Sequence, residues 1–331
     1  MKDELRAFCE SFIRNRDIIK STFKMENATV ATVCANRFAK LGIDADAEKL
    51  KECRRILREK TGVFSNFRGT LELPITTMMA SKTSSEAFLE RTIEIYNELK
   101  AAFHSSTHLI MAAAAMAEMV PSGDVSDRIA RGKEIYNRMK KEHSFLTNYE
   151  DTIFAMLLAF SEKDIDTLIN EQEVAFKTLK ESIKPDLNSL QSATHILSIT
   201  NGEIEDKCMK INEIFTNLKN NGRKYSKYYE FPVLAVLADS DMSAYDVVMD
   251  MLDADAFLAT QKGYGFFGVT KDVRLMHAAL LVSDMISGNE ISDNGIADIT
   301  TLAETLAMVA AEQATTAAIL VSITASTSVT H

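Results

Sequence analysis

Tryptophan is absent from this sequence, and the residues that interrupt helices are scarce, with 12 glycines and four prolines in 331 residues. Inside a helix, proline costs about 3 kcal/mol and glycine about 1 kcal/mol relative to alanine. Their scarcity leaves few enforced breaks, while alanine, methionine, leucine, glutamate and lysine, which favour helices, are plentiful. We therefore predict an all-α fold.

Cysteine is also scarce. The four thiols, Cys9, Cys34, Cys53 and Cys208, form neither a CxxC pair nor the spacing of a zinc site. The first residues, MKDELRAFCESF, lack the basic and apolar regions of a signal peptide. We expect buried, reduced thiols in a cytoplasmic protein, and no cofactor.

An excess of positive charge is missing as well, since the net charge is −10 at pH 7. A general nucleic-acid or anionic-membrane surface needs a basic footprint, so we expect neither partner, although a local basic patch stays compatible with this charge. The uncharged run at 313–329 is diluted by threonine and serine. A membrane span usually needs about 20 predominantly apolar residues. We expect instead a soluble helix over 296–329 that covers the rest of the chain or pairs with a second copy in a homo-oligomer.

One short phrase recurs about every 40 residues. It reads Glu-Ile-Tyr-Asn-Glu-Leu-Lys at 94–100 and Glu-Ile-Tyr-Asn-Arg-Met-Lys at 134–140, and it returns as Glu-Ile-Phe-Thr-Asn-Leu-Lys at 213–219. A weaker copy lies at 174–180 and a faint one at 56–60. The apolar residues form a stripe on one helical face. The closing lysine suits the C-terminal end of the helix dipole.

A second apolar run follows each phrase after a polar linker, at 71–80, 109–119, 153–160, 196–199 and 233–238. These runs are hydrophobic on most sides, which is typical of a helix that is buried by neighbours on both sides. Each unit is thus an outer amphipathic helix, a turn and an inner buried helix. We predict that residues 1–331 form a single domain of five or six tandem hairpins, stacked as an α-solenoid or a curved α/α array.

Within this domain, residues 1–42 are predicted to be N-terminal capping helices, 43–287 the hairpin repeats, and 288–331 a C-terminal helix rich in alanine and threonine. Asp44 or Asp46 is expected to cap the helix that begins near residue 47, because an aspartate side chain accepts hydrogen bonds from the first free backbone N–H groups.

Three histidines suggest one metal hypothesis. His104 and His108 have the i, i+4 spacing that places two imidazoles on one helical face, and His143 occupies nearly the same linker position one repeat later. The HExxH pattern of a zinc hydrolase is missing. We favour the alternative that these are polar linkers that happen to contain histidine.

Two segments suggest a ligand. Gly263, Gly265 and Gly268 match GxGxxG, but that motif binds a dinucleotide only between a strand and a helix, and no strand is expected here. A glycine-rich turn that packs its aromatic residues is the favoured interpretation. A loop that holds an anion ahead of a helix is the alternative. Arg68 could bind a carboxylate or phosphate, or it could form a structural salt bridge or cap carbonyl groups.

The segments Asn66-Phe67-Arg68-Gly69 and Leu73-Pro74, followed by Glu94-Ile95-Tyr96, resemble a bacterial family known as domain of unknown function 4003. The resemblance runs from about Lys49 to Met285. It implies a bacterial cytoplasmic protein, with no activity, cofactor or catalytic residue to transfer.

Two functions remain from the sequence. The preferred one is a scaffold that binds a protein or peptide, because the chain is a repeat array without a convergent catalytic set. The alternative is an enzyme or small-ligand-binding protein whose pocket is formed by the repeat linkers. If the polar linkers converge on one deep pocket, the enzyme or ligand-binding function is favoured. If they are spread along an open groove, the scaffold is favoured.

Overall fold

The computed structural model describes residues 1–289 apart from 25, 27, 64, 200, 201, 229 and 266–268. Over these residues it contains 14 α-helices, two short 3₁₀ helices and no strand, which confirms the all-α prediction. Residues 290–331 lie outside the described residues, so the C-terminal helix over 296–329 and its pairing with a second copy stay predictions.

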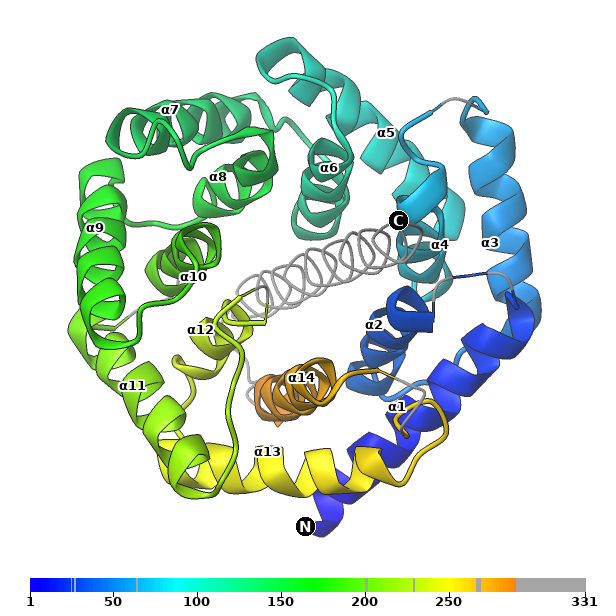
Figure 1. The fold of residues 1–331 in the computed structure, drawn as a ribbon. Helices are drawn as coiled ribbons and strands as arrows, with labels where there is room; N and C mark the ends of the chain where they lie inside the picture. The colour runs from blue at the N-terminus through cyan, green and yellow to red at the C-terminus, as the bar shows by residue number, and fades with distance from the viewer. Residues whose placement is uncertain are drawn as a thin grey trace, which may run out of the picture.

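The α-helices form two concentric rings (Figure 1). The outer ring consists of α1 (Asp3–Thr22), α3 (Ala47–Lys60), α5 (Ser85–Ala102), α7 (Ser126–Glu142), α9 (Ile165–Ser182), α11 (Ile204–Asn220) and α13 (Ala244–Ala259). The inner ring consists of α2 (Ala28–Lys40), α4 (Glu72–Ala80), α6 (Thr107–Met119), α8 (Thr152–Leu158), α10 (Leu187–Ile199), α12 (Val233–Leu237) and α14 (Lys271–Asn289). The 3₁₀ helices, η1 (Gly69–Leu71) and η2 (Tyr149–Asp151), precede α4 and α8.

The array closes on itself. Each outer helix contacts the next outer helix, and the last one, α13, contacts α1 (Figure 1). The last inner helix, α14, contacts α2. The helices of residues 1–42, expected to cap the N-terminal end of the array, therefore form a hairpin with a neighbour on each side. With this pair the ring has seven hairpins rather than the five or six expected.

The inner helices α6 and α8 are buried because their sequences are apolar on all sides. Every residue of α8 is buried, and so are all residues of α6 from Leu109 to Ala117. The outer helices bury one stripe each; in α7, for example, Ile129, Ile135 and Met139 are buried. The hydrophobic core therefore lies between the two rings and around the inner helices.

The repeated phrase has a repeated geometry. Its lysine follows its aromatic residue by four positions, so the ammonium group lies over the ring one helical turn earlier. Nζ of Lys100 lies 4.9 Å from the ring centroid of Tyr96, and Nζ of Lys140 lies 5.9 Å from that of Tyr136. The weaker copy has the same arrangement, with Lys180 5.6 Å from the ring of Phe176.

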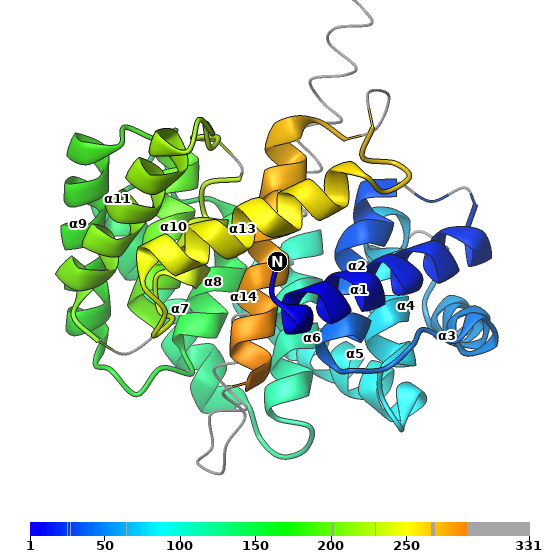
Figure 2. The ribbon, with the colours of Figure 1, turned by 90° about the horizontal axis from the view of Figure 1, so that it is seen from below.

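The ring has two different ends. Most outer helices lie along the ring and are seen lengthwise in Figure 1, whereas most inner helices cross them steeply and are seen end-on. The segments that lead from an outer to an inner helix gather, in their described residues, at what we call the connection end; they lie within 23–27, 61–71, 103–106, 143–151, 183–186, 221–232 and 260–270. Neighbouring connections contact each other. Asn66 donates to Ser105 (3.0 Å), and the backbone N–H of Asp186 donates to the carbonyl of Lys227 (2.8 Å). In Figure 2, α14 runs from this end, at the top, to the opposite end, at the bottom.

At the opposite end, cationic side chains meet the carbonyl groups where inner helices terminate. Arg91 donates to the carbonyl of Val120 (3.1 Å), Arg128 to that of Ala159 (2.8 Å), and Lys207 to that of Leu197 (2.9 Å). These cations offset the partial negative charge at the C-terminal ends of the helices. Their positive charge is therefore used within the fold.

Membrane insertion was not expected, and none of the described helices combines the length with the apolar character that a transmembrane segment requires.

Candidate functional site

The histidines of the metal hypothesis all lie at the connection end, but they do not share a helical face. Helix α6 begins at Thr107, because Ser106 caps it by accepting a hydrogen bond from the N–H of Leu109 (3.1 Å). His104 precedes this cap and is exposed, whereas His108 is in the first turn. The expected i, i+4 geometry on one helix is therefore not formed.

His143 follows the end of α7 and binds a different neighbour. Its Nε2 lies 2.7 Å from Oε1 of Glu173, and its ring packs on Phe176 with centroids 4.5 Å apart. In the part of the chain that the structure describes, no group of three or more histidine, cysteine, aspartate or glutamate side chains is arranged to hold a metal ion.

The glycine-rich segment lies between two helices, α13 and α14, so the strand that a dinucleotide-binding motif requires does not precede it. Gly263 adopts a φ of 92°, a conformation that favours glycine. Tyr264 is buried and hydrogen-bonds to His277, which supports a turn whose aromatic residue packs on the last hairpin. Gly265 is exposed, and Gly268 lies outside the described residues.

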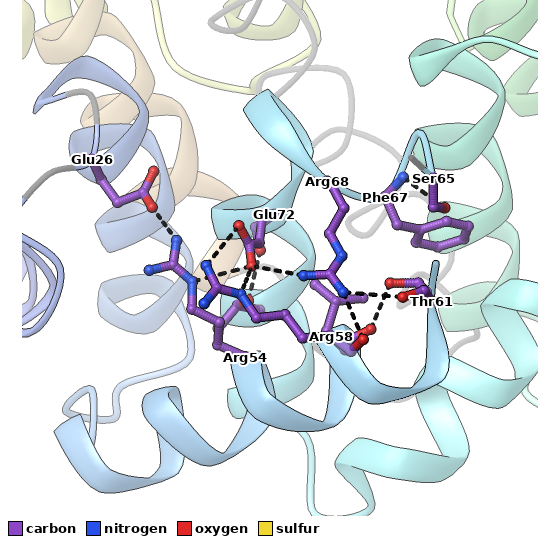
Figure 3. A network of polar contacts seen from close by, with 10 residues as sticks. Glu26, Arg54, Arg58, Thr61, Ser65, Phe67, Arg68 and Glu72 are labelled. Atoms are coloured by element: carbon purple, nitrogen blue, oxygen red, sulfur yellow. Dashed lines mark hydrogen bonds and ion pairs between the residues drawn. The ribbon is translucent and has the colours of Figure 1, made fainter. Parts of the chain in front are cut away.

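Arg68 is part of a polar network between α3 and α4 (Figure 3). Its Nη2 donates to the carbonyls of Arg58 (2.6 Å) and Thr61 (3.0 Å), and its Nη1 lies 3.8 Å from Oε1 of Glu72. Arg68 thus caps the C-terminal carbonyls of α3, as the structural alternative in the sequence predicts.

Glu72 is the centre of this network, and it is almost fully buried (Figure 3). Arg58 binds it with two hydrogen bonds, one from Nε to Oε1 and one from Nη2 to Oε2 (3.2 Å). Nε of Arg54 lies 3.6 Å from Oε1. Burial alone would raise the pKa of Glu72, but the hydrogen bond from Arg58 and the charges of the three arginines outweigh it and lower the pKa.

A second polar cluster lies where α8 and α10 meet. Oδ1 of Asp151, in η2, lies 3.4 Å from Nε2 of His195, and the His195 side chain is only 2% exposed. Neither Nε2 of His195 nor Oε1 of Gln191 has a hydrogen-bond partner, although both atoms are buried. Burial lowers the pKa of His108, and the charge of Asp151 opposes this shift. The cluster joins residues that are distant in sequence, so no local pattern indicated it.

The most regular feature of the connection end is a circle of lysines. Each outer helix carries one near its C-terminal end or in the connection that follows: Lys20, Lys60, Lys100, Lys140, Lys180, Lys219 and Lys262. The sequence repeat identified five of these, and its step of about 40 residues also leads from Lys60 back to Lys20.

Most of these lysines have no counter-charge among the described residues. Lys60 pairs with Glu86 and Glu90. For the other six, the described residues provide no ion pair or hydrogen bond, and all but Lys20 are exposed. Lysines and arginines outnumber carboxylates in the connections and the helix ends that lead into them, although the whole chain has a net charge of −10.

Large apolar side chains are also exposed at this end. Phe145 is fully exposed, Val63 is 78% exposed, Tyr228 64% and Tyr149 55%. Exposed aromatic and aliphatic groups beside cations are typical of an interaction surface. We call the circle of lysines together with these four side chains the basic face.

These features define a closed ring of α-helical hairpins with one basic face. The family described as "Protein of unknown function (DUF4003)" matches residues 15–314. The chain belongs to this family, and the resemblance predicted from the sequence is confirmed. It is similar to the uncharacterized protein YeaA of Bacillus subtilis (strain 168), with 22% identity over 288 residues, which cover 85% of this chain and 83% of that protein. No solved structure matches the chain significantly.

Proposed function

We propose that the protein binds an acidic segment of a partner protein on its basic face. The observation that carries this proposal is that Phe145, Val63 and Tyr228, the three most exposed large apolar side chains among the described residues, lie at the same end of the ring as the unpaired lysines. Cations at the opposite end, such as Arg91, Arg128 and Lys207, already bind carbonyl groups. The open concave groove of a solenoid, which the sequence favoured as the binding surface, is replaced by the basic face.

Two physical effects act together on such a partner. The positive ends of the inner-helix dipoles point toward the basic face, and the lysines add full charges, so acidic residues are attracted to it. Contact with Phe145 and Tyr228 would bury apolar surface, and this contributes about 25 cal/mol per Å². Charge increases the association rate and specificity, and the apolar contacts lengthen the lifetime of the complex.

The experiment measures binding of a fluorescent peptide that alternates glutamate and phenylalanine, by anisotropy at low salt. Replacing Lys100, Lys140 and Lys180 together by glutamine should weaken binding at least tenfold. The control replaces three cations outside the basic face, Arg6, Arg14 and Lys51, by glutamine, and it should leave binding within about twofold, since the charge change is the same. Equal weakening in both variants, or wild-type binding that does not saturate, would overturn the proposal.

A membrane is tested in parallel. Vesicles with anionic lipids also attract lysines and exposed aromatic residues. Sedimentation with such vesicles that depends on Lys100, Lys140 and Lys180, without binding of the peptide, would replace the protein partner by a membrane surface and so overturn the proposal. All four cysteines are buried free thiols, which supports the accompanying proposal of a cytoplasmic, reducing location.

A second candidate function is binding of a small polar ligand, the alternative left open by the sequence. It is favoured by the buried, unpartnered atoms of Gln191 and His195 beside Asp151. A buried polar atom without a partner is costly, by about 1–3 kcal/mol, unless water or a ligand binds it. A thermal-shift screen with polyols and amino acids tests this function: a ligand that stabilises the wild type, but not Gln191→Leu, supports it. If no compound does so, binding of polyols and amino acids at this site is rejected.

A further inference from the structure

We infer that a hollow between the end of α1 and the outer side of α3 binds a small oxyanion, such as a phosphate or a carboxylate. This site is separate from the basic face, and the inference does not rest on the proposed function. The hollow has a volume of about 390 Å³ and is lined by Phe23, Lys51, Arg54, Arg55, Arg58 and Glu59. A phosphate or a small carboxylic acid fits within a space of this size.

The charge of the lining is the first argument. Four of the six side chains are cationic, and Glu59 is the single carboxylate among them. Some of this charge is compensated nearby: Arg55 binds Glu52 (2.6 Å) and Glu59 (2.5 Å), and Lys51 binds Glu48 (2.7 Å). Arg54 and Arg58, however, share the Glu72 network with Arg68, so three guanidinium groups face Glu72 and the neighbouring Glu26. These three guanidinium groups carry one positive charge more than Glu72 and Glu26, whereas Arg55 faces two carboxylates. The excess of positive charge is therefore local to the Arg54 and Arg58 side of the hollow.

Unused hydrogen-bond donors are the second argument. Nε of Arg54 is buried and has no hydrogen-bond partner, because Oε1 of Glu72 is 3.6 Å away. The Nη1 groups of Arg54 and Arg58 also have no hydrogen bond within the described residues. A guanidinium group presents its N–H groups in a plane that matches two oxygens of a carboxylate or phosphate.

The third argument is that the arginines are held in place before any ligand binds. The guanidinium group of Arg54 lies 4.1 Å from the ring centroid of Phe23, and its Nη2 binds Glu26. Arg58 is fixed by its two bonds to Glu72 (Figure 3). Because these side chains are already ordered, an anion does not have to restrict them, and less binding free energy is lost to conformational entropy.

The experiment is isothermal titration calorimetry of the full chain with inorganic phosphate and, separately, with succinate. We expect saturable 1:1 binding of at least one of them. Replacing Arg58, whose side chain is 52% exposed, by glutamine should weaken it at least fivefold. Arg14→Gln is the matched control, because Arg14 is 57% exposed, has a single ion pair at 3.7 Å and lies away from the hollow.

Binding of phosphate alone would identify the ligand as a phosphate, and binding of succinate alone as a carboxylate; both results support the site. A second variant, Phe23→Leu, keeps all charges but removes the surface on which Arg54 packs, and it should also weaken binding. Absence of saturable binding to the wild type would overturn the inference. Equal loss in Arg14→Gln and Arg58→Gln would overturn it too, because the effect would then be one of net charge.

Discussion

The phenol oxygen of Tyr264 lies 2.9 Å from Nδ1 of His277, and both side chains are buried. Burial, together with the charge of Arg16, lowers the pKa of His277 to about 3. An unfolded histidine titrates near 6.5. Between these two values the unfolded chain binds a proton that the folded chain does not bind. The contribution of His277 to the free energy of unfolding is therefore fully present above about pH 6.5. It decreases as the pH falls below that value, by at most about 1.4 kcal/mol per pH unit.

The first prediction is that His277→Gln reduces this pH dependence. The variant can still bond to Tyr264, but it has no proton to gain. Urea unfolding at about pH 7 and about pH 5 should show a smaller loss of stability in the variant than in the wild type. The exposed His104 provides the control, and His104→Gln should keep the wild-type slope. If His277→Gln lost as much stability between about pH 7 and about pH 5 as the wild type, the lowered pKa of His277 would be contradicted.

The second prediction concerns Asp255, which is 1% exposed and binds both Arg223 and Arg274. Asp255→Ala should lower the free energy of unfolding by about 3–5 kcal/mol, because it leaves the mostly buried Arg274 without a counter-charge. Asp166, which is 82% exposed and pairs with Arg138, is the control. Asp166→Ala should cost less than about 1 kcal/mol. Similar losses in both variants would show that the ion pair around Asp255 is not buried as described.

The third prediction concerns the contact between α7 and α8. A Cβ atom on Gly132 would lie only 2.5 Å from Sδ of Met156 and 3.3 Å from the carbonyl oxygen of Ala155. Gly132→Ala should therefore destabilise the protein by about 1–3 kcal/mol through overpacking, more than the gain of about 1 kcal/mol from helix propensity. In a background that carries Met156→Ala, the same change should be neutral or stabilising. A single variant more stable than the wild type would contradict the close packing.

The fourth prediction concerns the start of α3. The sequence leaves Asp44 and Asp46 as alternative caps, and in the structure Asp46 accepts hydrogen bonds from the N–H groups of Glu48 (2.8 Å) and Lys49 (3.0 Å). These bonds also lower the pKa of Asp46. Asp46→Ala should lower the urea midpoint of unfolding, while Asp44→Ala, which removes only an exposed ion pair with Arg14, should leave it nearly unchanged. The reverse order would assign the cap to Asp44.

Much of the local structure followed from the sequence, because it depends on residues close together in the chain. The apolar run at 109–119 became the inner helix α6, and the repeated phrase became the C-terminal half of the outer helices. The expected placement of His104 and His108 on one helical face failed because of a capping interaction. Ser106 caps α6, so the helix begins after His104 and includes only His108. Arg68 could be identified, but its partner Glu72 could not be chosen from spacing alone.

The sequence by itself determined that the chain is helical, that its helices pair as hairpins, and that a lysine ends most of the outer helices, because helix propensity, apolar periodicity and the helix dipole act within a few turns. Only the tertiary structure decided that the array closes. Closure depends on the angle between successive hairpins, which is set by the packing of many side chains, such as Met156 against Gly132. Closure also turns lysines spaced about 40 residues apart into one circle. The packing of two successive hairpins brings Asp151 to His195.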